Sequence, residues 1–257
     1  MATVPNPFEA PGEFYDYLAE NIRDPRFVFM NYGYSDPDGA DDFSWIEPPD
    51  QIWKYSLNLL KRLVGRVDIR GKRVLDVGCG RGGNAAALSR YFGAAEVVGL
   101  DLSAPAIALA RQTIDDPRVT FAVGDALSLP FPEGRFDVVT NIESAQHYPD
   151  KGRFFDEARR VLAPGGHFCI TDFSMDVEDM KALVRAANFE IVEFEDISVG
   201  AQGAVVRCKE ERIGLLREFI ARGTASSEAA SWMIAALEGH VPDDDVHYHR
   251  WILRKKQ

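Results

Sequence analysis

Residues 73–84 read Arg73-Val-Leu-Asp-Val-Gly-Cys-Gly-Arg-Gly-Gly-Asn84, and this stretch decides the fold. Val74, Leu75 and Val77 form a short apolar run of the kind that a buried parallel strand shows. Six residues, four of them glycine, then break the run, and good helix formers follow at 85–88. A strand, a glycine loop and a helix in this order open a nucleotide-binding βαβ unit. There the backbone approaches a ligand closely beside the free N–H groups of a helix N-terminus.

Two ligand classes compete for this loop. Gly78, Gly80 and Gly83 match the dinucleotide fingerprint G-x-G-x-x-G, which is weak on its own. Asp76-x-Gly78-x-Gly80-x-Gly82 instead resembles the first motif of class I methyltransferases, whose loop passes under the amino-acid part of S-adenosylmethionine (SAM). An acid at the strand end suits a cationic ligand and repels a diphosphate. A turn without any ligand is the plain alternative, and three glycines within five residues argue against it. The resemblance implies a cofactor site that includes Asp76, Gly78, Cys79, Gly80, Gly82 and Asn84.

Size, composition and charge limit the possible classes. The chain has 257 residues, of which 46% are hydrophobic and 27% charged, as in one large globular domain or one domain with an added cap. Its apolar runs are too short to span a membrane, and no signal segment opens it. Three scattered cysteines predict no disulfide framework, so we expect a cytoplasmic protein. A net charge of −11 argues against nucleic acid as a partner. We therefore expect a small-molecule acceptor, and a monomer or homodimer.

Strand and helix patterns alternate from Gly71 onward, which is the signature of a doubly wound α/β sheet. Apolar runs predict strands at 73–77, 96–100, 119–123, 137–141, 167–171, 190–196 and 246–253. Helices are predicted at 84–92, after Ser103, at 152–162 and at 177–187. The pattern predicts a doubly wound sheet of seven strands, and the resemblance of its first motif implies the Rossmann-like sheet of class I methyltransferases.

Two segments lie outside this alternation. Residues 1–65 contain helical spacing at 14–22 and 52–63 around an aromatic-rich piece at 27–34, and we expect them to form an N-terminal cap. Residues 199–243 interrupt what would be a short hairpin and show helical periodicity at 205–220 and 226–237. We expect this helical insertion to act as a lid. The whole of 1–257 is then one methyltransferase domain with its core at 66–198 and 244–257.

Asp101 stands at the end of the second strand, eighteen residues after Gly83. This is close to the spacing at which a carboxylate meets both hydroxyls of a ribose. NAD enzymes use the same arrangement, so Asp101 and its neighbour Leu102 support an adenosine ligand without choosing between NAD and SAM. The plain alternative is that Asp101 caps the following helix.

Gly124-Asp125-Ala126 favours SAM. It follows the third strand and resembles the adenine-binding position of class I methyltransferases. The resemblance implies that Asp125 receives the adenine amino group and that a neighbouring backbone N–H reads the ring. The alternative of a bare turn is weakened because the glycine loop and Asp101 are both in register.

Asn141-Ile-Glu-Ser-Ala-Gln-His-Tyr-Pro149 follows the fourth strand, at the sheet edge where open α/β sheets bind ligands. We expect Asn141 to hold the methionine end of the ligand and His147 to lie beside the transferring methyl. The near-neutral pKa of histidine makes His147 a candidate general base for a hydroxyl. The alternative is a loop histidine that bonds backbone or stacks on Tyr148.

His247 and His249 lie two apart on the last predicted strand and so share one face. That spacing alone favours a place at the rim of the core over a metal pair, and we expect no metal site.

Four segments together resemble bacterial small-molecule O-methyltransferases of the phthiotriol and demethylrifamycin type. They are Asn31-Tyr-Gly-Tyr34, 141–149, Arg160-Val-Leu-Ala-Pro-Gly-Gly166 and Thr171-Asp-Phe173. The resemblance implies SAM as the cofactor, Tyr34 as part of its site, and methyl transfer to a hydroxyl of a small, largely apolar, polyketide-like product. Similarity of Asn141-Ile-Glu-Ser to tocopherol-type C-methyltransferases keeps C- or N-methylation open. A SAM-binding protein that guides a cyclisation without methyl transfer, and a regulatory SAM-binding partner, are further alternatives.

Overall fold

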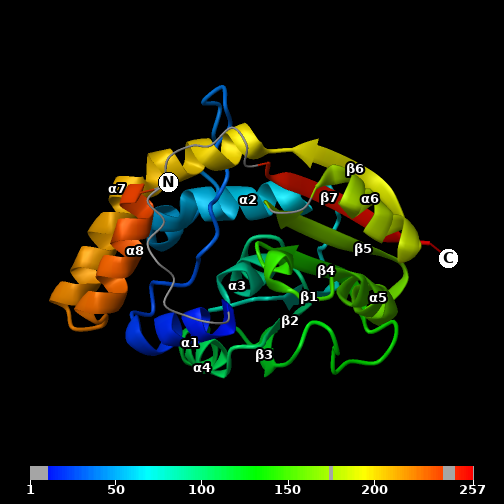
Figure 1. Ribbon diagram of the computed structural model, residues 1–257, viewed down its shortest axis with the longest axis horizontal. Coiled ribbons are helices and arrows are strands. Elements are labelled where there is room, and N and C mark those ends of the chain that lie inside the picture. Colours follow the sequence, from blue (N-terminus) through cyan, green and yellow to red (C-terminus); the bar gives the residue numbers. More distant parts are fainter. Residues whose placement is uncertain (1–10, 174–175, 240–246, 257) are drawn as a thin grey trace.

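The computed structural model describes residues 11–173, 176–239 and 247–256 (Figure 1). Its centre is one seven-stranded sheet with the order β3-β2-β1-β4-β5-β7-β6, in which β7 alone runs antiparallel to its neighbours. The strands are β1 Arg73–Val77, β2 Glu96–Asp101, β3 Val119–Val123, β4 Phe136–Ile142, β5 Leu162–Asp172, β6 Phe189–Asp196 and β7 His249–Lys255. The predicted fold class, a doubly wound α/β sheet with a helical segment before the last strand, is confirmed.

Helices cover both faces of the sheet. They are α1 Pro11–Asn21, α2 Lys54–Val64, α3 Gly83–Arg90, α4 Ala104–Thr113, α5 Lys151–Val161, α6 Val177–Ala186, α7 Ser198–Ala221 and α8 Ser227–Gly239. Two short 3₁₀ turns, η1 Pro48–Trp53 and η2 Ala145–His147, complete the described elements. No helix in the described ranges is both long and apolar enough to cross a lipid bilayer.

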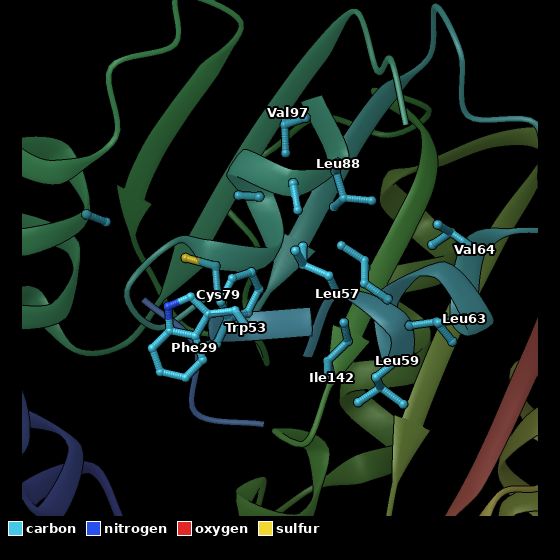
Figure 2. Close-up of a cluster of buried hydrophobic side chains, with 14 of the residues drawn as sticks. Phe29, Trp53, Leu57, Leu59, Leu63, Val64, Cys79, Leu88, Val97 and Ile142 are labelled. Carbon is cyan, nitrogen blue, oxygen red and sulfur yellow. The ribbon is translucent and has the colours of Figure 1, made fainter. Parts of the chain in front are cut away.

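Alternation along the strands builds a separate core on each face. Val74 of β1 faces the cluster beneath α2 and α3, whereas Leu75 and Val77 face the cluster beneath α5 and α6. Figure 2 shows part of the first cluster, to which Trp53 of the cap, Leu57 of α2 and Val97 of β2 all belong. The cap is therefore packed into the main core.

Arg81 attaches the cap directly to the glycine loop. Its guanidinium is buried and donates hydrogen bonds to the carbonyls of Leu18, at 2.6 Å, and of Ile22, at 2.7 Å. These carbonyls lie at the C-terminal end of α1, where a cation complements the helix dipole. An isolated bridge between Ile22 and Ala225 then joins the cap to the helical insertion. In Figure 1, α7 and α8 lie side by side at one end of the molecule, next to α1.

Several predicted boundaries differ from the structure. β5 begins at Leu162 rather than 167, and β7 begins at His249, while residues 240–246 lie outside the described ranges. α7 begins at Ser198 rather than 205. Gly200 lowers helix propensity in these first turns, but a Cβ there would collide with the ring of Tyr34. The contact with Tyr34 thus requires a glycine at position 200, and this glycine weakens the helical sequence pattern at the start of α7.

Candidate cofactor and acceptor site

A cavity of about 580 Å³ lies beyond the carboxyl ends of the central strands, between the glycine loop and the cap. Most of the residues predicted from the sequence line it. They are Gly78, Cys79, Gly80, Asn84, Asp101, Leu102, Gly124, Asp125, Ala126 and His147. The cap contributes Tyr15 and the segment 28–32 to the opposite wall. The cavity is therefore formed jointly by the sheet and the cap.

The glycine loop needs its glycines for two different reasons. Gly78 has φ +73°, and a Cβ there would collide with the side chain of Ser144. Gly80 has φ +52°, and the nearest atom to its virtual Cβ is the Met30 methyl at 3.7 Å. Gly78 lets the loop pack against the segment after β4, whereas Gly80 leaves the cavity side of the loop open to a ligand.

Asp101 lines the cavity and orders the glycine loop. Its Oδ2 accepts from the Gly80 N–H at 2.8 Å and its Oδ1 from the Ser103 N–H at 2.9 Å. Burial raises the pKa of this carboxyl, and the two backbone hydrogen bonds oppose that rise. Ser103, not Asp101, caps α4, since its Oγ accepts from the Ala106 N–H. The capping alternative for Asp101 is thus wrong.

One apolar side chain, Leu102, and one acidic side chain, Asp125, also line the cavity. Leu102 is 67% exposed, an unusual exposure for a leucine that lines a cavity. Asp125 lies after β3 and accepts from the Leu127 N–H at 2.8 Å through Oδ1. The ring of an aromatic base can pack on Leu102 while the Asp125 carboxylate accepts a hydrogen bond from the amino group of that base.

Three predicted residues support the loop from behind instead of lining the cavity. Gly82 fits against Phe121, and Asn141 donates to the Val77 carbonyl at 2.9 Å. Asp76 is buried, and its Oδ1 accepts from the Thr140 hydroxyl at 2.8 Å. Burial raises the pKa of Asp76 to about 7. These three residues hold the glycine loop in shape.

Tyr34 does not belong to this site, and its assignment to the cofactor was wrong. Gly33 takes φ +87° and turns the chain, so that the ring of Tyr34 packs against Gly200 and under Arg62. Asn31 and Tyr32 of the same segment line the cavity in its place. The sequence marked the right segment, but the turn at Gly33 decided which side chains face inward.

Within the described ranges, two buried oxygens in the cavity wall have no hydrogen-bond donor: Asn31 Oδ1 and Gln146 Oε1. Asp76 Oδ2, behind the loop, also lacks one. Buried acceptors of this kind require donors, which the ammonium of a methionine moiety supplies and a diphosphate does not. Arg81, a cation in the lining, already donates to the cap carbonyls. The residues present therefore fit SAM better than NAD.

His147 lies at the mouth of the cavity in a small polar cluster. Its Nε2 is 3.1 Å from the Tyr15 hydroxyl and 3.1 Å from Gln146 Nε2. Burial, assisted by Lys151, lowers the pKa of His147 below its ordinary value. Burial likewise raises the pKa of Tyr15, so the phenol keeps its proton. At neutral pH the imidazole is uncharged and can accept a proton.

Glu143 is the second titratable group in the cavity wall. Its Oε1 accepts from the Tyr32 N–H at 2.8 Å and from the Tyr248 hydroxyl at 2.6 Å. Burial raises the pKa of Glu143 to about 7, and its backbone takes φ +50°, which non-glycine residues rarely adopt. The rings of Tyr32, Phe173 and Tyr248 pack together, with the Phe173 centroid 5.2 Å from that of Tyr32 and 6.0 Å from that of Tyr248. Sequence reasoning missed Tyr248 because it returns to the site only after the helical insertion.

A smaller cavity of about 170 Å³ lies next to the first and shares Phe29, Met30 and Tyr32 with it. Its other walls come from Phe27 and Trp53 of the cap and from α7 and α8, and they are apolar except for Arg212. The Arg212 guanidinium donates to the Ser56 hydroxyl at 3.1 Å. We call this space the apolar chamber. The helical insertion and the cap thus meet on the same side of the sheet.

Comparisons with known proteins agree with this geometry. The family described as "Methyltransferase domain" matches residues 75–170. The chain is 36% identical to a fatty-acid O-methyltransferase of Mycolicibacterium smegmatis, over 80% of this chain and 78% of that protein. It is 33% identical to a probable phthiotriol/phenolphthiotriol dimycocerosates methyltransferase of Mycobacterium ulcerans, over 72% of each.

Two solved structures extend the comparison. The [4+2]-cyclase SpnF superposes with a TM-score of 0.73 at 27% identity, over 95% of this chain and 94% of that one. A phosphoethanolamine N-methyltransferase of Haemonchus contortus, solved with S-adenosylhomocysteine, gives a TM-score of 0.68 at 26% identity, over 80% and 53%.

Proposed function

This chain belongs to the class I SAM-dependent methyltransferases, and we propose that it methylates a hydroxyl of a small, largely apolar acceptor with His147 as the general base. SAM is the cofactor, and transfer of its methyl group to a small molecule is the activity. The proposal concerns the acceptor atom, the nature of the acceptor and the residues that act.

The observation that carries the proposal is the junction of the two cavities. The larger cavity contains the carboxylate and amide oxygens that we assign to SAM, and across Phe29, Met30 and Tyr32 it meets the apolar chamber. An acceptor with a polar reacting end and an apolar body fits this pair, because its body leaves water while its reacting end stays beside the loop. Polyketide-like and lipid alcohols have this shape.

We propose the following cofactor residues. Asp101 accepts from the ribose hydroxyls, Leu102 and Ala126 pack on the adenine, and Asp125 accepts from its amino group. The oxygens of Asn31 and Gln146 accept from the ammonium. Bound SAM supplies an electrophilic methyl group on a sulfonium. The remaining residues assigned to this site are Gly78, Cys79, Gly80 and Asn84, with Asp76, Gly82 and Asn141 behind them.

His147 would take the proton that the acceptor hydroxyl loses as its oxygen bonds to the methyl carbon. Neutral imidazole accepts this proton at Nε2 when the acceptor hydroxyl takes the place of the Tyr15 hydroxyl at that atom. Positioning and exclusion of water by the cap add to the rate because a hydroxyl attacks best when it is held in line and desolvated.

We also propose that 1–257 is one domain, with a cap at 1–65, a SAM-binding core at 66–198 and 244–257, and a lid at 199–243. Contacts between α1, α4 and α8 support the grouping of cap and lid. We further propose a cytoplasmic location, which would keep the three buried cysteines reduced. A monomer or a homodimer is compatible with this arrangement.

A second candidate is cyclisation without methyl transfer, favoured by the extensive superposition on SpnF. C- or N-methylation is the third. One experiment separates them: purified protein is incubated with SAM and a panel of apolar alcohols, fatty acids, amines, and phenolic and polyene compounds. One S-adenosylhomocysteine per O-methylated alcohol supports the proposal. A rearranged product without S-adenosylhomocysteine, or methylation at carbon or nitrogen, would refute it.

A further inference from the structure

Three side chains with metal-ligating groups converge at the point where the helical insertion leaves and rejoins the sheet. Asp196 ends β6, His249 begins β7, and His247 lies two residues before it. One ligand atom from each lies within 4.8 Å of those of the other two. The spacing of the histidines alone gave no reason to expect a metal, because the carboxylate comes from another strand.

The backbone fixes this arrangement before any ion arrives. Asp196 and His249 are directly opposite each other in the β6–β7 ladder, where cross-strand Cβ atoms lie about 4.5–5.5 Å apart. The rings of His247 and His249 are parallel, with centroids 6.0 Å apart. Asp196 Oδ1 accepts from the Ser198 N–H at 2.9 Å, which orients the carboxylate. Asp196 and His247 are exposed, so an ion has a path in.

Two imidazole nitrogens and one carboxylate oxygen suit zinc and its neighbours in the first transition row, whereas magnesium and calcium prefer all-oxygen sites. We propose that Asp196, His247 and His249 form a structural site for a divalent ion of the zinc class, which ties together the two ends of the helical insertion. Water would complete the coordination. The proposal is independent of the acceptor and of the role of His147.

The site also connects to the cavity. Tyr248 stands between the two histidines, so its side chain points to the other face, where its hydroxyl donates to Glu143 Oε1 at 2.6 Å. The Ile197 N–H donates to the Tyr248 carbonyl and the Tyr248 N–H to Ser198 Oγ, each at 2.8 Å. An ion at the rim would hold this junction and thereby both α7 and the hydrogen bond from Tyr248 to Glu143.

The test uses the full chain after treatment with a chelator. Calorimetric titration with zinc chloride should show one saturable equivalent, and cobalt chloride should give visible ligand-field bands. Magnesium chloride should give neither. His247→Gln and Asp196→Asn should each weaken zinc binding by about tenfold or more. The matched control, His167→Gln, changes a histidine of β5 that lies outside the cluster and should bind zinc as the wild type does.

Hydrogen exchange supplies the structural readout. Zinc should slow exchange in α7 and in the first residues of β7 of the wild type, but not in His247→Gln. SAM titration shows whether each variant is folded. Absence of saturable zinc binding by the wild type overturns the proposal without any variant. Wild-type-like zinc affinity in both folded ligand variants overturns it as well, since the ion would then lie elsewhere.

Discussion

The hydroxyl of Tyr15 lies 3.1 Å from Nε2 of His147, and this contact joins the first helix of the cap to the loop after β4. The rings also meet edge to face, with centroids 5.5 Å apart. Because burial keeps the phenol protonated, it can donate to the imidazole. The pair therefore closes the cavity and leaves His147 neutral.

His147→Ala tests the base directly. Turnover should fall by about 10²–10⁴-fold, since a hydroxyl loses its proton acceptor, while SAM affinity by calorimetry stays nearly unchanged. In the wild type, protonation of His147 removes the base at low pH, so the rate should rise with pH. Because the pKa of His147 is lowered, this limb should lie below pH 6.5, and the variant should lack it.

Two control variants, His167→Ala and Glu143→Gln, show whether the loss of turnover in His147→Ala is specific to His147. His167→Ala removes a histidine that does not line the cavity and should leave turnover intact. Glu143→Gln keeps an acceptor for Tyr32 and Tyr248 but cannot take a proton. If His147→Ala keeps full turnover while Glu143→Gln loses it, Glu143 is the base. Parallel loss of SAM binding in His147→Ala would assign that residue to the cofactor.

Tyr15→Phe tests how the imidazole is held. The lost hydrogen bond should lower kcat by about 2- to 10-fold, in line with a contribution of roughly 0.5–1.5 kcal/mol. A donor to Nε2 stabilises the neutral imidazole, so its removal should also shift the pH limb of kcat upward. A merely structural tyrosine would lower kcat without moving the limb, and that outcome would count against this role.

Asp101→Ala should reduce SAM affinity by about 1–3 kcal/mol, because the ribose hydroxyls lose their acceptor and the Gly80 N–H loses its own. Calorimetry with SAM and S-adenosylhomocysteine measures this, and NAD should not bind to the wild type. Asp115→Ala, at an exposed position in the loop after α4, serves as the control. Unchanged affinity in Asp101→Ala would remove Asp101 from the site.

Glu143 predicts a pH dependence of stability. Its folded pKa of about 7 exceeds the ordinary value of 4.5, so between these values the folded chain binds the extra proton. The contribution of Glu143 to the free energy of unfolding is full below pH 4.5 and is lost as the pH rises towards 7. The loss is at most about 3 kcal/mol.

Denaturant unfolding at several pH values between 4.5 and 8 measures this loss. Glu143→Gln should make the free energy of unfolding decline less steeply with pH. Part of the decline should remain in this variant, because the pKa of Asp76 is raised in the same way. Identical slopes for the wild type and Glu143→Gln would show that Glu143 is ionised throughout.

Local patterns predicted the sheet side of the site well. The strand 73–77 and its glycine loop follow from side-chain alternation and from backbone freedom, both of which are local properties. The place of Asp101 follows because a βαβ unit fixes the distance between consecutive strand ends. All of these residues lie on one continuous part of the sheet.

The cap side could not be predicted in the same way. The left-handed turn at Gly33, which packs against Tyr55 of α2, places Tyr32 and not Tyr34 at the cavity, and the ring of Tyr34 packs instead against Gly200 of α7, far along the chain. Tyr15 reaches His147 only through the docking of α1 on Arg81. Asp196 meets His249 only through the ladder between β6 and β7. Contacts across long sequence separations decide these positions.

The apolar chamber predicts how the acceptor's chain length affects the rate. Each methylene that enters the chamber should gain about 0.8 kcal/mol, or about fourfold in kcat/KM, until about 170 Å³ is filled. Ala236 of α8 lines the chamber and is half-buried, so Ala236→Trp should fill it. The variant should lose the gain with chain length yet keep its activity on short acceptors and its SAM affinity. Ser231→Trp, on an exposed position of the same helix, is the matched control and should retain the gain. Equal chain-length profiles for the wild type and Ala236→Trp would show that the acceptor's apolar body lies outside the chamber.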